Sequence, residues 1–262
     1  MKIKFTPIIQ VRMKSTRLPR KALRKIGEKV MLEHVINQTL CSKYVKDVII
    51  ATTLSKEDKK IVDFCKKLGL KYYRGSDRDV LDRFYKAAKK FRCDPIIRIS
   101  SDCPFIDPKV IDKVISKFLK KSYDYIGNNI EKNGKNWKNS LCNFPQGMVV
   151  EISSFKTLEK AWKEAKKQSE REHVFPYVQF NPQIFKISNI KNSKNLSYIR
   201  CTVDRNVDLK FVNKIHERIS KKRKFVRISD IEKIVKKKPK LLNINNKIPF
   251  DEGYQKSLRR DK

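Results

Sequence analysis

The residues with the clearest chemical potential are the arginines, lysines and hydroxyls between Arg12 and Lys21. This segment follows the apolar run 5–11, so a strand would deliver it to the edge of a sheet. Arginine offers paired N–H donors, lysine a point charge and turn amides further donors, and such groups can surround a triphosphate. The spacing matches neither the P-loop nor the dinucleotide glycine pattern, so side chains would hold the phosphates. A merely solvated basic loop is the alternative.

Two aspartates could complete a nucleotide site by holding a metal ion. Asp102 follows the apolar run 96–100, and Pro104 stops that strand from continuing, so the carboxylate projects from the sheet edge. Asp204 repeats the arrangement after residues 198–203. Mg²⁺ is commonly held by one or two carboxylates together with phosphate oxygens, which makes the pair a candidate magnesium site. The alternative for Asp102 is a turn cap.

These residues need a framework that brings them together, and the apolar pattern predicts one. Strands are expected at 5–11, 47–52, 95–100 and 198–203, and helices near 30–42, 56–69, 78–91, 108–121, 154–167 and 207–220. The alternation predicts an α/β fold with three layers, in which helices cover both faces of a mostly parallel, twisted sheet. Ligands of such sheets lie at the carboxyl ends of the strands, where the basic loop, Thr52, Asp102 and Asp204 would meet.

Composition sets the broad class of protein. The 262 residues can bury a sizeable core, and we expect one α/β domain over 1–220, then a basic segment 221–262 with a helix near 229–238 and a mobile end at 256–262. No apolar stretch approaches the roughly 18 residues of a membrane span, and no signal pattern opens the chain. We therefore expect a soluble, cytoplasmic protein. The six cysteines and three histidines show no zinc or disulfide pattern.

The formal net charge of +35 raises a different hypothesis, a nucleic-acid-binding protein. The lysines come mostly as pairs at helical spacing, which indicates many solvated faces rather than one continuous groove. A broad positive field attracts anionic substrates, and it also causes salt-sensitive binding to nucleic acid without sequence preference. We expect any nucleic-acid binding to be of this non-specific kind.

Seven sequence blocks follow one another along the chain, at 10–21, 50–53, 74–83, 98–108, 144–147, 171–174 and 202–208. In content and order they resemble the cytidylyltransferases that activate acidic sugars, and most of all their SpsF-like branch. The resemblance covers residues 5 to about 212. It implies a fold of the nucleotide-diphospho-sugar transferase (GT-A-like) class, CTP as substrate, Mg²⁺ as cofactor and a small anionic acceptor. It also implies a homodimer formed through about 125–155.

The resemblance assigns roles to individual residues. It implies catalytic roles for Arg12, Lys21 and Asp102, and metal binding for Asp102 and Asp204. The nucleotide would contact Gln10, Arg12, Ser15, Arg17, Lys21, Thr52, Arg74, Asp82, Arg83 and Ser101. The acceptor would contact Gln146, Gly147, Glu151 and His173. Two residues depart from the family pattern: Arg20 stands where glycine is usual, and Gln146 where aspartate is usual.

Several of these residues also have plain structural interpretations. Arg74 and Arg83 could belong to an exposed, ion-paired helix start. His173 fits packing or a subunit contact better than a general base, because Arg171 and Glu172 beside it suggest an ion-pair network. Asp208 could cap the helix that follows Asp204, and Cys103 lacks a neighbouring histidine to activate it.

The expected reaction is attack by an acceptor hydroxyl on the α-phosphorus of CTP, with release of pyrophosphate, in surface glycan biosynthesis. Three alternatives stay open: a cytidylyltransferase for a non-sugar acceptor such as a phosphonate, a GT-A-like glycosyltransferase that uses a nucleotide sugar, and a basic nucleic-acid-binding protein. Arg12, Arg17 and Lys21 would neutralise charge on the β and γ phosphates.

Overall fold

A seven-stranded sheet forms the centre of the molecule, in the order β5-β4-β1-β6-β8-β7-β9. The computed structural model describes residues 5–120, 122–129, 143–219, 224–250 and 252–261. The strands are β1 (Ile8–Gln10), β4 (Ile49–Thr53), β5 (Lys71–Gly75), β6 (Ile96–Ser100), β7 (Tyr125–Gly127), β8 (Glu151–Ser153) and β9 (Ile187–Asn189). Only β8 runs antiparallel to its neighbours, β6 and β7. The predicted mostly parallel α/β sheet is confirmed.

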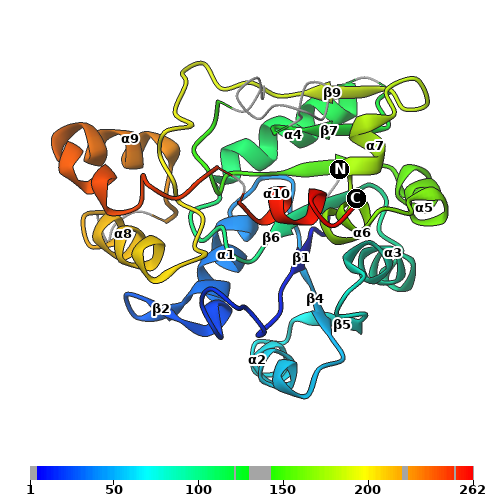
Figure 1. The fold of residues 1–262 in the computed structure, drawn as a ribbon, viewed down its shortest axis with the longest axis horizontal. Coiled ribbons are helices and arrows are strands. Elements are labelled where there is room, and N and C mark those ends of the chain that lie inside the picture. Colours follow the sequence, from blue (N-terminus) through cyan, green and yellow to red (C-terminus); the bar gives the residue numbers. More distant parts are fainter. Residues whose placement is uncertain (1–4, 121, 130–142, 220–223, 251, 262) are drawn as a thin grey trace.

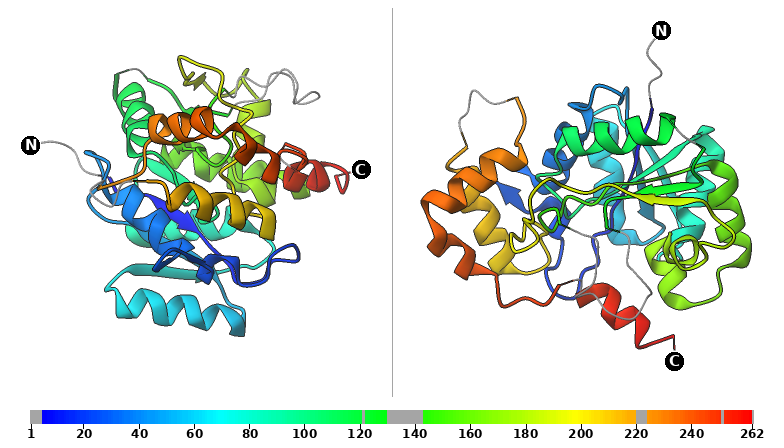
Figure 2. Two further views of the ribbon diagram at one scale, coloured as in Figure 1. Left: turned by 90° about the vertical axis from the view of Figure 1, so that its left-hand side faces the viewer. Right: turned by 90° about the horizontal axis from the view of Figure 1, so that it is seen from above.

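Side chains alternate across the strands, so each strand contributes to two cores. Ile8 and Ile49 point into one core, while Ile9 and Ile50, one residue on, point into the other. The first core packs against α3 (Val80–Phe91), α5 (Phe155–Glu164) and α7 (Pro176–Phe180). The second packs against α1 (Met31–Leu40), α2 (Lys59–Lys67), α4 (Pro108–Lys120), α8 (Asn206–His216) and α9 (Ile228–Lys237). The result is the expected three-layer arrangement (Figures 1 and 2).

Short elements connect and cover this framework. They are the hairpin β2 (Lys25–Ile26) and β3 (Lys29–Val30), the 3₁₀ turns η1 (Lys21–Leu23), η2 (Lys56–Asp58) and η4 (Pro239–Ile244), and the helices α6 (Gln168–His173) and α10 (Glu252–Leu258). Because β1, β4 and β6 are parallel, their carboxyl ends meet at one edge of the sheet. The basic loop and Asp102 both leave the sheet there.

The basic C-terminal segment packs onto the rest of the chain. Ile231 and Val235 of α9 are buried in the same core as β1 and β4. Asp107 joins α9 to α4, because one carboxylate oxygen accepts from the Lys109 amide and the other from the Ile228 amide. In Figures 1 and 2, α9 lies beside α8, and α10 returns to the side of the molecule where β1 ends. The domain boundary at residue 220 stays a prediction.

Two structural predictions are wrong. Residues 198–203 form no strand: within them only Arg200 makes a β-bridge, with Gln146, and a single bridge does not extend into a ladder. The end expected to be mobile, 256–262, instead begins with the last three residues of α10, a helix that packs on α6. Within the described residues, no helix combines the length and apolarity that a membrane crossing requires. The predicted dimer segment 125–155 includes 130–142, outside the described residues, and dimerisation stays a prediction.

Candidate active site

A cleft of about 530 Å³ opens at the carboxyl edge of the sheet, a size typical of small-molecule sites. It brings together most of the residues singled out in the sequence: Gln10, Arg12, Ser15, Arg17, Lys21, Arg83, Ser101, Asp102, Gly147, Glu151, His173 and Asp204. A second cavity of about 290 Å³, between the N-terminal ends of α4 and α9, contains none of them. The cleft is therefore the candidate active site.

The basic loop is held by its apolar residues and its backbone, which leaves its cations facing the cleft. Met13 and Leu18 are almost fully buried and anchor the loop in the core. The Met13 amide donates to Asp58 (2.8 Å), and the Leu18 amide donates to the Ser15 hydroxyl (3.3 Å). The loop closes where the Arg20 amide donates to the Met13 carbonyl (3.1 Å). Ser15 therefore shapes the loop from inside.

Arg20 takes the conformation for which glycine is suited. Its φ of 57° lies in the left-handed region, which costs a non-glycine residue about 1 kcal/mol or more. The structure keeps the glycine-type turn with arginine in it, and η1 begins at the next residue, Lys21.

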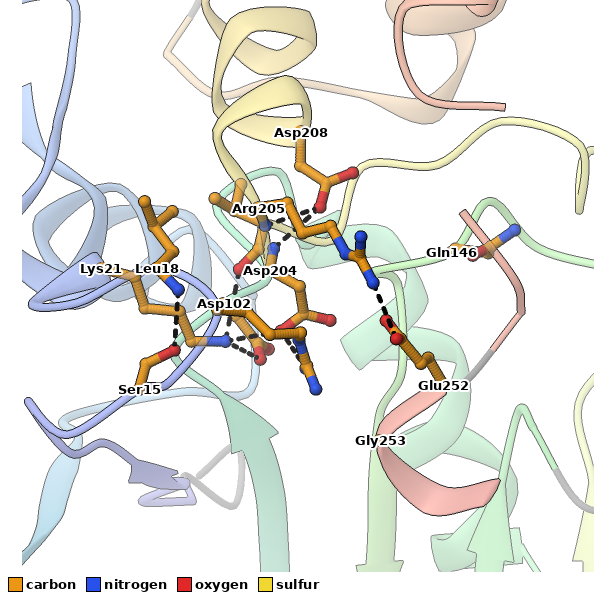
Figure 3. Close-up of polar contacts among 12 residues, drawn as sticks. Ser15, Leu18, Lys21, Asp102, Gln146, Asp204, Arg205, Asp208, Glu252 and Gly253 are labelled. Carbon is orange, nitrogen blue, oxygen red and sulfur yellow. Dashed lines mark hydrogen bonds and ion pairs between the residues drawn. The ribbon is translucent and has the colours of Figure 1, made fainter. Parts of the chain in front are cut away.

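Lys21, Asp102 and Asp204 line the cleft and form one cluster of ion pairs, the Lys21 cluster (Figure 3). The Lys21 ammonium lies 2.8 Å from Asp102 and 2.8 Å from Asp204, and it also donates to the Val203 carbonyl at 3.3 Å. Arg17 contacts the same Asp204 oxygen at 2.9 Å. Two carboxylates from distant parts of the chain thus converge on one cation.

The electrostatics of this group favour the charged forms. Burial by itself disfavours the charged Lys21, but the two aspartates outweigh it and raise its pKa. Burial likewise opposes ionisation of Asp102 and Asp204, and Lys21 overcomes this, so the pKa of each carboxyl is lowered. Burial, and then Asp102, raise the pKa of the Cys103 thiol well above its usual value. Cys103 is therefore no nucleophile at neutral pH.

Asp208 organises the segment that carries Asp204. Its carboxylate accepts from the Asp204 and Arg205 amides, at 3.0 and 2.9 Å, and so caps α8. It also pairs with Arg200 (2.9 Å), whose guanidinium reaches Asp204 at 3.1 Å. Asp208 is fully buried and does not line the cleft, in agreement with the capping interpretation.

The two carboxylates fit a divalent cation. They already approach one positive charge from two sides, and oxygen is the ligand atom that Mg²⁺ prefers. Among the described residues, no group of three or more His, Cys, Asp or Glu could hold a metal by itself. A metal on Asp102 and Asp204 would thus need oxygens from the substrate or water to fill its coordination shell.

Gly147 is required where it stands. Its φ is 90°, and a Cβ there would lie 2.7 Å from the Thr202 amide nitrogen and 2.9 Å from the Cys201 carbonyl carbon. The positive φ and the close backbone contact each disfavour a side chain at this position. The close approach lets the 144–148 turn lie against the extended segment before Asp204, since the Cys201 amide donates to the Gln146 carbonyl (2.8 Å).

A hydrogen-bonded group forms the floor of the cleft. Arg98 donates to Gln10 (3.0 Å) and pairs with Glu151, and Tyr125 donates to the other Glu151 oxygen (2.7 Å). Gln179 donates to the Tyr125 hydroxyl at 2.8 Å. Gln10 and Glu151 therefore line the cleft as parts of a fixed network.

Arg83 is a buried cation beside the cleft. Arg83 is only 2 % exposed. Its guanidinium donates to the Ser76 carbonyl, and its Nε has no hydrogen-bond partner among the described residues. Burial, followed by repulsion from Arg12, lowers its pKa to about 10. An anion in the cleft would compensate this charge.

Four predicted contact residues do not line the cleft: Thr52, Arg74, Asp82 and Gln146. The Thr52 hydroxyl is buried and donates to Asp58 (2.9 Å), and Arg74 lies in β5 and donates to the Thr53 and Ser55 carbonyls (both 3.0 Å). Asp82 accepts from the Trp162 indole (2.9 Å). Gln146 donates to the Ser197 carbonyl (3.1 Å) and accepts from Arg200 (3.0 Å), and it lies apart from the Lys21 cluster (Figure 3).

The sequence interpretation missed three contributors. Asp58 accepts hydrogen bonds from Met13, Thr52 and Thr53, and so fixes the start of the basic loop to β4. Arg98 was noted only as part of a block, although its place on β6 beside β1 sets it at the cleft floor. The third is α10, for which the pattern of apolar residues gave no signal.

His173 is a neutral packing residue. Its ring lies edge-on to Tyr254, with centroids 4.8 Å apart, and Nε2 is 3.1 Å from the Ser257 hydroxyl. Burial, then Arg98, lowers its pKa to about 3. A general base needs a pKa closer to the working pH, so the packing interpretation is the better one.

The depressed pKa predicts an effect on stability. An unfolded histidine, with a pKa of about 6.5, binds a proton more readily than folded His173, so stability falls as pH drops below about 6.5. Between pH 7 and pH 5 the wild type should lose about 1 to 2 kcal/mol more unfolding free energy than His173→Gln, a range that allows for the partial solvent contact of the ring. Urea denaturation at both pH values measures this difference in unfolding free energy.

The comparison of the two proteins isolates His173. Burial also lowers the pKa of His34, but His34 is present in both proteins, so its effect on stability is the same in each. Equal losses would show that His173 is not depressed.

The model of the cytidylyltransferase family matches residues 6–248, most of the chain. The chain belongs to this cytidylyltransferase family. The spore coat polysaccharide biosynthesis protein SpsF of Bacillus subtilis is 27 % identical over 226 residues, 80 % of this chain and 85 % of SpsF. A 3-deoxy-manno-octulosonate cytidylyltransferase of Geotalea daltonii is 31 % identical over 152 residues, 52 % of this chain and 58 % of that protein. Both bear out the family resemblance seen in the sequence.

A solved cytidylyltransferase of Leptospira borgpetersenii has the same architecture. It superposes with a TM-score of 0.84 at 30 % identity, over 95 % of this chain and 100 % of that chain. The family and this likeness together identify the chain as a nucleotidyltransferase enzyme with the GT-A-like fold, and CTP as its nucleotide fits the family.

Proposed function

We propose that this cytidylyltransferase transfers CMP from CTP to a hydroxyl of an acidic sugar, with Mg²⁺ held by Asp102 and Asp204. The observation that carries the proposal is the convergence of these two carboxylates on one cation, 2.8 Å from each, directly beside the basic loop. Phosphoryl transfer needs positioning and charge stabilisation rather than covalent catalysis, and this cleft offers both.

The reaction breaks one bond and forms one. The acceptor hydroxyl attacks the α-phosphorus of CTP, the bond from that phosphorus to the β-phosphate oxygen breaks, and pyrophosphate leaves while the hydroxyl proton passes to solvent or base. A bound Mg²⁺ would polarise the α-phosphate and favour the deprotonated acceptor hydroxyl. Arg12, Arg17 and Lys21 would stabilise the charge that develops on the leaving pyrophosphate.

Unpaired donors support an anionic nucleotide. Arg17 and Arg83 line the cleft, and the Nε atom of each is buried without a hydrogen-bond partner among the described residues. Buried donors are normally satisfied, so a pair of unsatisfied guanidinium nitrogens favours a ligand rich in acceptor oxygens. The β and γ phosphates of CTP have this character.

Two observations support an acidic sugar as the acceptor: the positive charge of the cleft and the names of related proteins. The cleft carries two further cations, Lys14 and Arg98, beyond those of the proposed phosphate contacts. One relative is named as a 3-deoxy-manno-octulosonate cytidylyltransferase and another as a spore coat polysaccharide biosynthesis protein. Gly147, Glu151 and His173 border the part of the cleft that we assign to the acceptor. We propose a role in making a surface glycan.

A pyrophosphate-release assay tests the function. Each of the four NTPs is incubated with Mg²⁺ and a panel of sugar acids and phosphonates. We expect release with CTP alone, dependent on one sugar acid. Release that depends on a phosphonate would replace the sugar by that acceptor. If CTP neither bound nor reacted, the cytidylyltransferase activity itself would be refuted for this chain, and salt-sensitive binding to nucleic acid would then favour the basic-protein hypothesis.

A further inference from the structure

Helix α10 forms one wall of the cleft, although it lies beyond the residues that match the family model. The match ends at residue 248, and α10 runs from Glu252 to Leu258. Gly253, Tyr254, Lys256 and Ser257 of this helix line the cleft, together with Arg260 just after it. Nothing in the family match therefore assigns these residues a role.

Contacts at both ends and in the middle hold α10 in place. Near its start, Glu252 pairs with Arg205 (2.7 Å), the residue after Asp204 (Figure 3). Beyond its end, Asp261 accepts from the Ser169 amide (2.8 Å) and from the Ser169 hydroxyl. Between them, Ser257 donates to Glu172 (2.8 Å). The helix thus has a fixed path across the cleft.

Helix α10 runs along the basic loop, from the side of Arg17 to the side of Arg12. A Cβ added to Gly253 would lie 3.9 Å from the Arg17 guanidinium. One turn on, Ser257 is bonded to Glu172, and Glu172 lies 4.0 Å from the Arg12 guanidinium. Residues of α10 that face the cleft therefore lie beside the same loop that we propose holds the triphosphate.

Two cations on this path have no partner among the described residues. Lys256 and Arg260 are exposed, line the cleft, and make no ion pair or side-chain hydrogen bond with any described residue. The acidic residues of α10 and its end, Glu252 and Asp261, already have partners in Arg205 and Ser169. Within the described part of the chain, Lys256 and Arg260 are thus two unpaired positive charges that line the cleft.

We propose that α10 completes the nucleotide site and that Lys256 and Arg260 bind the β and γ phosphates of CTP. The proposal rests on the proposed function, since it takes CTP as the substrate. Lysine provides a point charge and arginine a planar pair of donors, and phosphate oxygens accept from both. Together with Arg12 and Arg17 they surround the triphosphate from the loop side and from the α10 side.

The test compares two double variants of equal charge. Lys256→Ala/Arg260→Ala removes the proposed contacts. Lys247→Ala/Arg259→Ala removes one lysine and one arginine from the same segment, at exposed positions that do not line the cleft. Calorimetry at fixed ionic strength gives the Kd of the full-length proteins for CTP, inorganic pyrophosphate and CMP. All four substituted side chains are exposed, so equal melting temperatures are expected.

We expect Lys256→Ala/Arg260→Ala to weaken CTP and pyrophosphate binding about tenfold or more, CMP binding much less, and the control to change each Kd less than about twofold. Equal CTP affinity in the two double variants would overturn the role of α10 while leaving the proposed function intact. An equal loss for CMP and CTP would overturn the assignment to the β and γ phosphates. If the wild type itself bound no CTP, the proposed function would fall instead.

Discussion

Asp102→Asn is expected to lower kcat for CMP transfer by about 10³-fold or more, and to change the free energy of unfolding by less than about 1 kcal/mol. The amide keeps the shape of the carboxylate but loses the charge that would bind the metal. Lys21 still keeps Asp204 as a partner at 2.8 Å, so no buried cation is left unpaired. Pyrophosphate release at saturating CTP and acceptor measures kcat, and urea denaturation measures stability.

Asp208→Asn is the matched control for Asp102→Asn. Asp208 is a carboxylate close to Asp204, but it caps a helix and does not line the cleft. Asp208 is fully buried, pairs with Arg200 and accepts the Asp204 and Arg205 amides. Its replacement should cost stability, about 2 kcal/mol or more, while the folded fraction keeps most of its turnover. Turnover by Asp102→Asn close to the wild-type rate at saturating Mg²⁺ would remove Asp102 from the reaction.

The longer helices could be predicted because each carries its own periodic signal. α3 and α4, of 12 and 13 residues, bury a regular stripe of apolar side chains, and the sequence placed both to within a few residues. The strands β7, β8 and β9 have three residues each, too few to show an alternation. Their places in the sheet depend on neighbours far along the chain, and a local pattern contains no such information.

The site was predicted where backbone topology decides it, and missed where side-chain direction decides it. Parallel strands bring the basic loop and Asp102 together whatever the rotamers, and Lys21 then reaches Asp102. Thr52 lies at the same sheet edge, but its hydroxyl turns to buried Asp58 rather than to the cleft. Spacing along a sequence places a residue on an element and leaves its partner undetermined.

Helix α10 could not be predicted from the sequence, for a different reason. A helix of seven residues that buries only Tyr254 and Ser257 shows no apolar stripe, and its charge looks like that of a solvated tail. What holds it are polar contacts to Arg205, Glu172 and Ser169, residues that precede it by 47 to 92 positions. Such contacts can be found only when the fold is known.

Lys21→Met is expected to lower the free energy of unfolding by about 2 to 4 kcal/mol and to reduce turnover strongly. Its ammonium holds Asp102 and Asp204 together, and without it two mostly buried carboxylates repel each other with only Arg17 and Arg200 nearby. Partial solvent access keeps the cost below that of a fully buried pair. Urea denaturation without added metal measures it. Lys25→Met, at an exposed position of β2, is the control and should change stability by less than about 0.5 kcal/mol.

Added Mg²⁺ makes the same variant a test of the metal site. In the wild type the Lys21 ammonium occupies the position between the carboxylates, so a metal must compete with it for both. In Lys21→Met that competition is gone and the two like charges gain from any divalent cation, so excess Mg²⁺ should raise the Tm of the variant more than that of the wild type. Lys21→Met/Asp204→Asn, which retains one carboxylate, should lose most of this extra rise. Equal Mg²⁺-induced Tm shifts in the wild type and the variant would mean that Asp102 and Asp204 do not bind the metal. The two carboxylates would then serve chiefly to position Lys21 for the phosphates.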